Sequence, residues 1–235
     1  MDAGRIRDNL EQVKARIAEA ARRSGRGAES VRLVAVTKRS PPEWIRPLVA
    51  CGARDLGENY PQELWRKVES LADLGEDVRW HLIGHLQSNK VKKTLPMVAM
   101  IHAVDSLKLL QILDEAAGSM AVPPPVCLQV NTSGEPTKHG WDEESLLADA
   151  DSIAACRSIA IAGLMTMAAL GTTAETARGS FIELRGVRDR LRDRTGLPLD
   201  ELSMGMSNDF ESAVEEGATL VRVGSALFEG VGVAS

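Results

Sequence analysis

Lys38 stands two residues beyond the apolar stretch VRLVAV at 31–36, which predicts a buried β-strand. A lysine at the carboxyl end of such a strand can attack a carbonyl carbon when its amine is partly removed from water, because desolvation favours the uncharged amine. A solvated loop lysine is the simpler interpretation of that position taken alone. The chemistry of Lys38 therefore depends on the other polar residues that follow predicted strands.

Two segments near the end of the chain are suited to phosphate binding: MGMSND at 204–209 and VGSALF at 223–228. Ser207 and Ser225 supply hydroxyl groups, and Gly224 lets backbone N–H groups and a helix amino terminus approach an anion. The first segment is equally suited to capping a helix that follows it. The two roles can coexist, and both stay open from the sequence.

Arg222 alternates with Val221 and Val223 in an apolar strand, so its side chain must face either solvent or a specific partner inside the protein. We expect an interior partner.

His81 and His85 are four residues apart, a spacing that suits metal ligands on a helix, but RWHLIG predicts a strand and the motif H-E-x-x-H is absent. We therefore expect structural or supporting roles for both histidines.

Around eight short apolar strands alternate with predicted helices, and an amphipathic helix precedes them, ending near Ser24 and Gly25. Ser40 and Glu43 form a capping-box pattern at the start of the helix after the first strand. Alternating strands and helices predict a parallel sheet, and eight units favour a closed (β/α)₈ barrel. An open doubly wound sheet is the alternative, although neither G-x-G-x-x-G after the first strand nor a Walker motif is present. The predicted strands lie at 31–36, 54–56, 79–83, 98–104, 126–130, 159–165, 201–204 and 220–223.

Composition limits the class of protein. The 235 residues suit a single domain over 1–235, and 44% hydrophobic with 26% charged residues is typical of globular proteins. A net charge of −5 with dispersed basic residues argues against nucleic acid, and no apolar run is long enough to cross a membrane. Three widely spaced cysteines fit reduced thiols. We expect a cytoplasmic monomer.

A set of motifs spread over nearly the whole chain resembles one family. The motifs are AVTK at 35–38, GENYPQE at 57–63, WHLIGHLQSNK at 80–90, QVN at 129–131, GLMTM at 163–167, SMGMSNDF at 203–210 and VRVGSALF at 221–228. By these motifs the chain is similar to the pyridoxal-phosphate homeostasis protein family, which resembles the barrel domain of alanine racemase. The resemblance is specific because the motifs keep the family's order and approximate spacing.

The resemblance implies a role for each of several residues. It implies that Lys38 holds pyridoxal 5′-phosphate as a Schiff base and that Arg222 faces the pyridine nitrogen, where a cation weakens the cofactor as an electron sink. The phosphate-binding positions implied are Ser207, Gly224 and Ser225, and two further positions match the cofactor pocket, Asn59 and Met204. His81 and Asn131 receive only a supporting role. Three residues depart from the family's commonest pattern. Ser225 stands where threonine is frequent, Pro61 takes the place of the usual apolar residue after the tyrosine, and Glu229 replaces part of a glycine-rich ending.

The resemblance also implies a function. Alanine racemase takes its second acid–base group from an additional domain and a dimer partner, and this chain ends soon after its eighth strand. We therefore expect a non-catalytic binder that stores or delivers the cofactor, with transient contacts to pyridoxal-phosphate-dependent apoenzymes. An amino-acid racemase or lyase that uses Lys38 with Tyr60 or a histidine is the alternative. A third possibility is an interaction protein that binds client enzymes under control of the cofactor.

Overall fold

The computed structural model describes residues 2–133, 135, 139–169 and 174–232. Eight parallel strands form a closed barrel in which each strand pairs with the next and β1 pairs with both β2 and β8. Val34 of β1 pairs with Asp55 on one side and with Arg222 on the other, so the sheet has no free edge there. The barrel prediction is confirmed, and the open sheet is excluded. The strands are β1 Arg32–Val36, β2 Asp55–Glu58, β3 Arg79–Leu82, β4 Met100–Val104, β5 Val126–Gln129, β6 Ile161–Met165, β7 Glu201–Ser203 and β8 Leu220–Val223.

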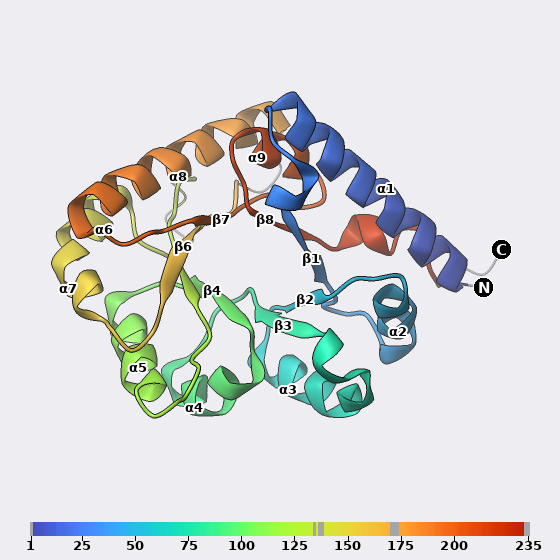
Figure 1. The fold of residues 1–235 in the computed structure, drawn as a ribbon, viewed down its shortest axis with the longest axis horizontal. Coiled ribbons are helices and arrows are strands. Elements are labelled where there is room, and N and C mark those ends of the chain that lie inside the picture. Colours follow the sequence, from blue (N-terminus) through green and yellow to red (C-terminus); the bar gives the residue numbers. More distant parts are fainter. Residues whose placement is uncertain (1, 134, 136–138, 170–173, 233–235) are drawn as a thin grey trace.

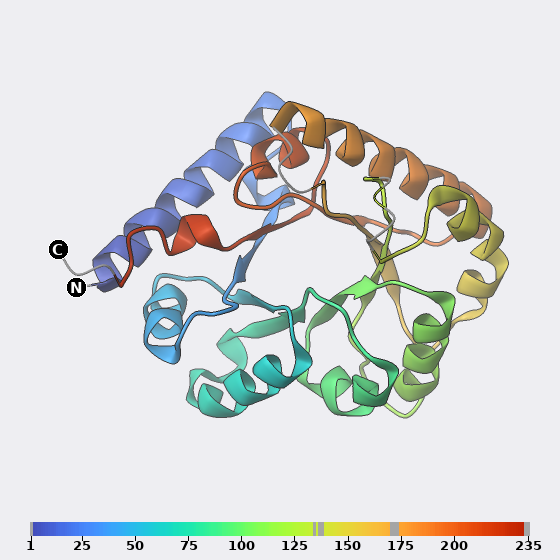
Figure 2. The same cartoon turned by 180° about the vertical axis from the view of Figure 1, so that it is seen from behind.

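Helices surround the barrel on its outside (Figures 1 and 2). Two helical segments are irregular: residues 143–155 form two helices that meet at Asp149, and residues 88–97 form a single α-helical turn between two 3₁₀ turns. No helix in the described part of the chain is long and apolar enough to cross a bilayer. The helices are α1 Asp2–Arg23, α2 Pro42–Ala50, α3 Pro61–Ser70, α4 Val91–Thr94, α5 Leu107–Ala117, α6 Glu143–Ala148, α7 Ala150–Ala155, α8 Ala174–Thr195 and α9 Phe210–Glu215.

The N-terminal helix α1 completes the ring of helices between α2 and α9 (Figure 1). Its buried side chains recur every three or four residues and form one apolar face: Ile6, Leu10, Val13 and Ile17. The segment after β8 lies against this helix, because the side-chain amide of Asn9 donates to the carbonyl oxygens of Leu227 and Glu229, each at 3.1 Å. Helix α1 thus holds the 3₁₀ turn Ser225–Leu227 in place at the end of β8.

Buried apolar side chains form two groups. The larger group packs the helices onto the outside of the sheet, and the smaller one packs inside the barrel around Val34, Val36, Cys127 and Met165. Polar residues fill the rest of the interior and hydrogen-bond to one another across it. The barrel is therefore a filled core, and a ligand site can form only at its ends, which in this architecture means the carboxyl ends of the strands.

Candidate functional site

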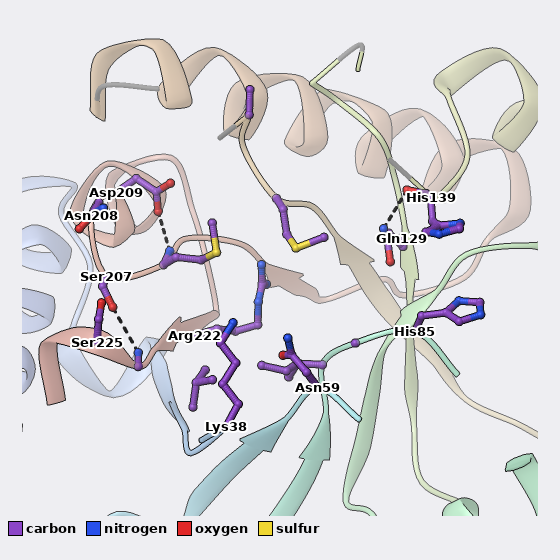
Figure 3. Close-up of a pocket in the computed structure, with 17 residues that line it drawn as sticks. Lys38, Asn59, His85, Gln129, His139, Ser207, Asn208, Asp209, Arg222 and Ser225 are labelled. Atoms are coloured by element: carbon purple, nitrogen blue, oxygen red, sulfur yellow. Dashed lines mark hydrogen bonds between the residues drawn. The ribbon is translucent and has the colours of Figure 1, made fainter. Parts of the chain in front are cut away.

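A cavity of about 440 Å³ opens at the carboxyl ends of the strands. Six of the seven predicted site residues line it (Figure 3): Lys38, Asn59, Ser207, Arg222, Gly224 and Ser225. They come from the ends of β1, β2, β7 and β8, so the closed barrel brings the first and last motifs of the chain together. Lys38 and Arg222 lie in the middle of the view, with Ser207 and Ser225 on one side and His85 and His139 on the other.

Lys38 lies in a tight turn that follows β1. The backbone N–H of Ser40 donates to the carbonyl oxygen of Thr37 at 2.9 Å, and Arg39 adopts a φ of 66°, which is uncommon for a residue other than glycine. The predicted capping box is wrong: helix α2 has Pro41 at its N-cap and no side-chain cap, because Ser40 belongs to the turn. Lys38 is exposed and makes no hydrogen bond or ion pair within the described residues, so its amine is free for a ligand.

A buried ion pair lies beneath this turn. The ammonium group of Lys67 in α3 donates to the carbonyl oxygen of Thr37 and to Oε1 of Glu58, both at 2.7 Å. The hydroxyl of Thr37 donates to the same Glu58 oxygen at 2.5 Å. Thr37 precedes Lys38, and Glu58 precedes Asn59. The pair therefore joins the ends of β1 and β2 at the two places where the predicted site residues begin.

Asn59 presents a free amide to the cavity. Its side chain makes no hydrogen bond among the described residues, although its backbone lies tightly against the next strand's loop. A Cβ atom built on Gly84 would lie 2.3 Å from the carbonyl oxygen of Asn59, so only glycine allows the two loops this approach. The amide of Asn59 is thus held at the cavity wall with its donors and acceptor available.

Backbone N–H groups converge on Ser207 opposite Lys38. The Ser207 hydroxyl oxygen accepts from the N–H group of Gly224 at 3.2 Å (Figure 3) and from that of Ala226 at 3.4 Å. The Ser225 hydroxyl lies beside them on the same cavity wall. These hydroxyl and N–H groups form a set of donors for an anion, and the set comes from a loop and a single 3₁₀ turn rather than from a long helix.

The loop after β7 is shaped by its own contacts. Gly205 has a φ of 93°, and a Cβ atom there would lie 2.6 Å from the Cβ of Ala213. Asp209 is the N-cap of α9 but makes no side-chain cap; its carboxylate accepts from the backbone N–H of Met206 at 2.5 Å instead. Burial raises the pKa of Asp209 above its usual range. The capping role expected for 207–209 therefore takes a different form, which leaves Ser207 for the cavity.

Arg222 is almost fully buried and reaches the cavity from inside the barrel. Its guanidinium group donates to the Ser203 hydroxyl at 2.6 Å and to the Thr166 carbonyl oxygen at 2.8 Å, which are the interior partners that the alternating pattern predicted. Burial lowers the pKa of Arg222 to about 10, while Asp209 and Cys127 act to raise it. Arg222 therefore remains a cation at neutral pH.

The other end of the cavity carries two histidines that the sequence analysis did not place there. His85 and His139 stack with ring centroids 5.2 Å apart, and Nδ1 of His85 lies 2.7 Å from a carboxylate oxygen of Asp105. Gln129 lies beside them and donates to the carbonyl oxygen of His139 at 2.8 Å. No group of three potential metal ligands occurs among the described residues.

The structure places the remaining predicted residues away from the cavity. Met204 is fully buried in the outer core, because its neighbour Ser203 faces the barrel interior and successive side chains point to opposite faces of a strand. Met206, which follows the turn at Gly205, and Met167 line the cavity instead. His81 lies inside the barrel. Asn131 holds its own loop by accepting from Ser133 and donating to the carbonyl oxygen of Glu135.

The fold and the cavity together define a closed α/β barrel with an unpaired lysine after its first strand and converging backbone N–H groups after its last. The family model described as the N-terminal domain of alanine racemase matches residues 2–231, and the chain belongs to that family. Within it, this chain is a member of the pyridoxal phosphate homeostasis proteins. It is 40% identical over 221 residues to the protein of that name from Aquifex aeolicus, covering 94% of this chain and 96% of the relative. The Pseudomonas aeruginosa protein of that name is 43% identical over 223 residues, covering 95% and 94%.

Solved structures agree with this assignment. PipY of Synechococcus elongatus, determined with pyridoxal phosphate bound, superposes with a TM-score of 0.84 and 38% identity over 95% of this chain and 99% of PipY. Alanine racemase from Corynebacterium glutamicum gives a TM-score of 0.69 with 17% identity, covering 96% of this chain and 63% of the racemase. The second likeness shows the shared barrel fold alone.

Proposed function

We propose that this chain binds pyridoxal 5′-phosphate through Lys38 and acts in homeostasis of that cofactor, by storage or delivery. The observation that carries the proposal is the arrangement in one cavity of an unpaired lysine amine and a set of anion donors around Ser207. An aldehyde and a phosphate on one small ring match these two features, since the amine can form a Schiff base with loss of water.

The phosphate end of the cavity fits such a ligand. The N–H groups of Gly224 and Ala226 donate to the Ser207 hydroxyl, and phosphate oxygens are stronger acceptors for the same groups. A Cβ atom on Gly224 would lie 3.2 Å from Cβ of Val36, so a larger residue would disturb the wall beside Lys38. Asn59 adds an amide with both hydrogen-bonding functions free.

The electrostatics of the cavity favour binding over catalysis. When bound, the cofactor can supply an electron sink to an amino acid, and that property is strongest when its ring nitrogen is protonated. Arg222 can only donate hydrogen bonds and stays charged at neutral pH, so a ring nitrogen beside it is held unprotonated. The relatives' name, a homeostasis protein, is consistent with that chemistry.

One observation supports a second candidate, an amino-acid racemase or lyase. His85, held by the carboxylate of Asp105, lines the cavity and has a second ring nitrogen for proton transfer. Tyr60, the alternative base considered from the sequence, is 66% exposed and is not among the residues that line the cavity. Steady-state assays of racemisation and elimination with common amino acids decide between the candidates, and activity that His85→Gln abolishes would favour the enzyme.

We also propose that residues 1–235 act as a single-domain cytoplasmic monomer that meets apoenzymes only transiently. All three cysteines are free thiols, as expected in a reducing compartment. The large exposed apolar side chains of the described residues lie on separate elements, at Tyr60, Val122 and Ile182, rather than in one patch. Light scattering on purified protein, and transfer of bound cofactor to a pyridoxal-phosphate-dependent apoenzyme, test these two points.

The first experiment is a visible absorbance spectrum of the purified protein with added pyridoxal phosphate, before and after borohydride reduction. We expect an absorbance band that reduction removes, and peptide mapping should find the reduced adduct on Lys38. Lys38→Ala should lose the band, whereas Lys108→Ala, which removes an exposed lysine from α5, should keep it. A wild-type protein that takes up no cofactor, or an adduct that maps to another lysine, would refute the proposal.

A further inference from the structure

A chain of hydrogen bonds runs through the interior of the barrel and ends at Arg222. Asp55 Oδ1 lies 2.9 Å from Nε2 of His81, and Nδ1 of His81 lies 2.9 Å from Nε2 of His102. Nδ1 of His102 lies 2.7 Å from the hydroxyl of Ser203, which accepts from Arg222. The bond from His102 in β4 to Ser203 in β7 crosses the barrel, because those strands are not neighbours.

The positions of the protons in this chain follow from its two ends. A guanidinium group only donates, so the Ser203 oxygen accepts from Arg222 and the Ser203 proton goes to Nδ1 of His102. A carboxylate only accepts, so Nε2 of His81 donates to Asp55. The remaining bond then requires a proton on Nε2 of His102 and a bare Nδ1 on His81. Every link has one donor and one acceptor.

The charges of the individual groups agree with this polarity, by which we mean that each hydrogen bond is donated in the direction from Arg222 toward Asp55. Burial lowers the pKa of His102 well below its usual range, and the nearby Arg222 cation lowers it further, so His102 is neutral. Burial acts to raise the pKa of Asp55, but hydrogen bonds from Arg79 and His81 outweigh it and hold that pKa below its usual range. In the opposite polarity, the Ser203 oxygen would accept twice and its proton would have no acceptor among the hydrogen bonds of the described residues.

We infer that Asp55, His81, His102 and Ser203 form an interior relay that positions the Arg222 guanidinium group at the cavity and couples it to the opposite end of the barrel. The far end of the relay is the ion pair of Asp55 with Arg79, whose two hydrogen bonds are 2.7 and 2.6 Å long. The Arg79 side chain is 51% exposed, so the relay reaches solvent there. The effect on the ligand rests on the proposed binding of pyridoxal phosphate, but the proton positions do not.

The relay is tested first without any ligand. In ¹⁵N-labelled protein, long-range ¹⁵N–¹H correlation spectra report which ring nitrogen of each histidine carries the proton. The chain has four histidines, and His85→Ala and His139→Ala identify the two signals from the cavity. We expect His81 and His102 both with Nε2 protonated and Nδ1 bare at neutral pH. A proton on Nδ1 of His102 would overturn the inference.

The second test removes one link. Ser203→Ala takes away one of the two acceptors of Arg222 and the donor to His102, and we expect the dissociation constant for pyridoxal phosphate to rise about tenfold. Ser203→Thr keeps the hydroxyl and should restore binding to within about threefold. Ser212→Ala removes a hydroxyl from a buried position of α9 outside the relay and should leave binding unchanged. Equal binding by wild type and Ser203→Ala would overturn the positioning role.

The two tests separate the inference from the proposed function. If wild-type protein takes up no pyridoxal phosphate, the proposed function fails, while the spectra of the ligand-free protein still decide the polarity of the relay. A distant variant extends the test: Arg79→Gln changes only the solvent end, and we expect the His81 nitrogen shifts to move in it. Unchanged His81 shifts in Arg79→Gln would refute the coupling between the two ends.

Discussion

Replacing Lys67 with methionine should strongly destabilise the protein. The Lys67 and Glu58 side chains are only 2% and 1% exposed, and their charged atoms lie 2.7 Å apart. Lys67→Met keeps the length and apolar stem of the side chain but leaves the Glu58 carboxylate buried without its cation. Breaking a buried pair in this way costs about 3–5 kcal/mol of the free energy of unfolding, because water cannot replace the lost partner.

The neighbouring residue on the same helix is a matched control. Arg66 pairs with Glu63 at 2.6 Å, but these side chains are 62% and 47% exposed. Arg66→Met should therefore lower the free energy of unfolding far less than Lys67→Met does, since exposed pairs are screened by solvent. Urea denaturation followed by circular dichroism measures both values. The contrast between adjacent positions isolates burial as the cause.

The double variant Lys67→Met with Glu58→Gln completes the experiment. Glutamine removes the stranded charge, so the double variant should recover most of the stability lost in Lys67→Met. The double variant should still take up less cofactor than the wild type, because the Thr37 carbonyl beneath the Lys38 turn still lacks its donor. A loss below about 1 kcal/mol in Lys67→Met, or a double variant no more stable than the single one, would refute this reasoning.

Three further predictions follow from single residues. Gly205→Ala should lower the free energy of unfolding by about 2 kcal/mol or more in urea titrations, because its φ is 93° and a new Cβ would lie 2.6 Å from a Cβ of α9. Burial acts to raise the pKa of Asp55, but hydrogen bonds from Arg79 and His81 outweigh it and lower that pKa. The contribution of Asp55 to stability is therefore present above the unfolded carboxyl pKa and lost as pH falls below about 4. Asp55→Asn should flatten that part of a curve of stability against pH. Burial raises the pKa of Cys127 to about 12, so mass spectrometry should find its thiol unmodified by iodoacetamide in native protein at about pH 8 and modified after unfolding.

Much of the site could be predicted because its residues follow strands. Lys38, Ser207 and Gly224 each come shortly after an apolar run, and the carboxyl ends of parallel strands meet at one end of a barrel. The place of Met204 in the outer core has a local cause: side chains alternate along a strand, so Met204 faces away from the interior that its neighbour Ser203 faces. Lys67 left a signal, since it falls on the apolar face of α3 with Leu64, but charge alone favoured an exposed position.

The elements and their order could be predicted from the sequence alone, because apolar periodicity and turn residues act over a few positions. It also identified the family, through motifs that need no coordinates. Which polar side chains meet inside the barrel depends on how the strands close in three dimensions. His102 and Ser203 are 101 residues apart and belong to strands that do not pair, yet closure of the barrel brings them within 2.7 Å. Such a contact depends on strand stagger and on filling a closed interior, which no local pattern encodes.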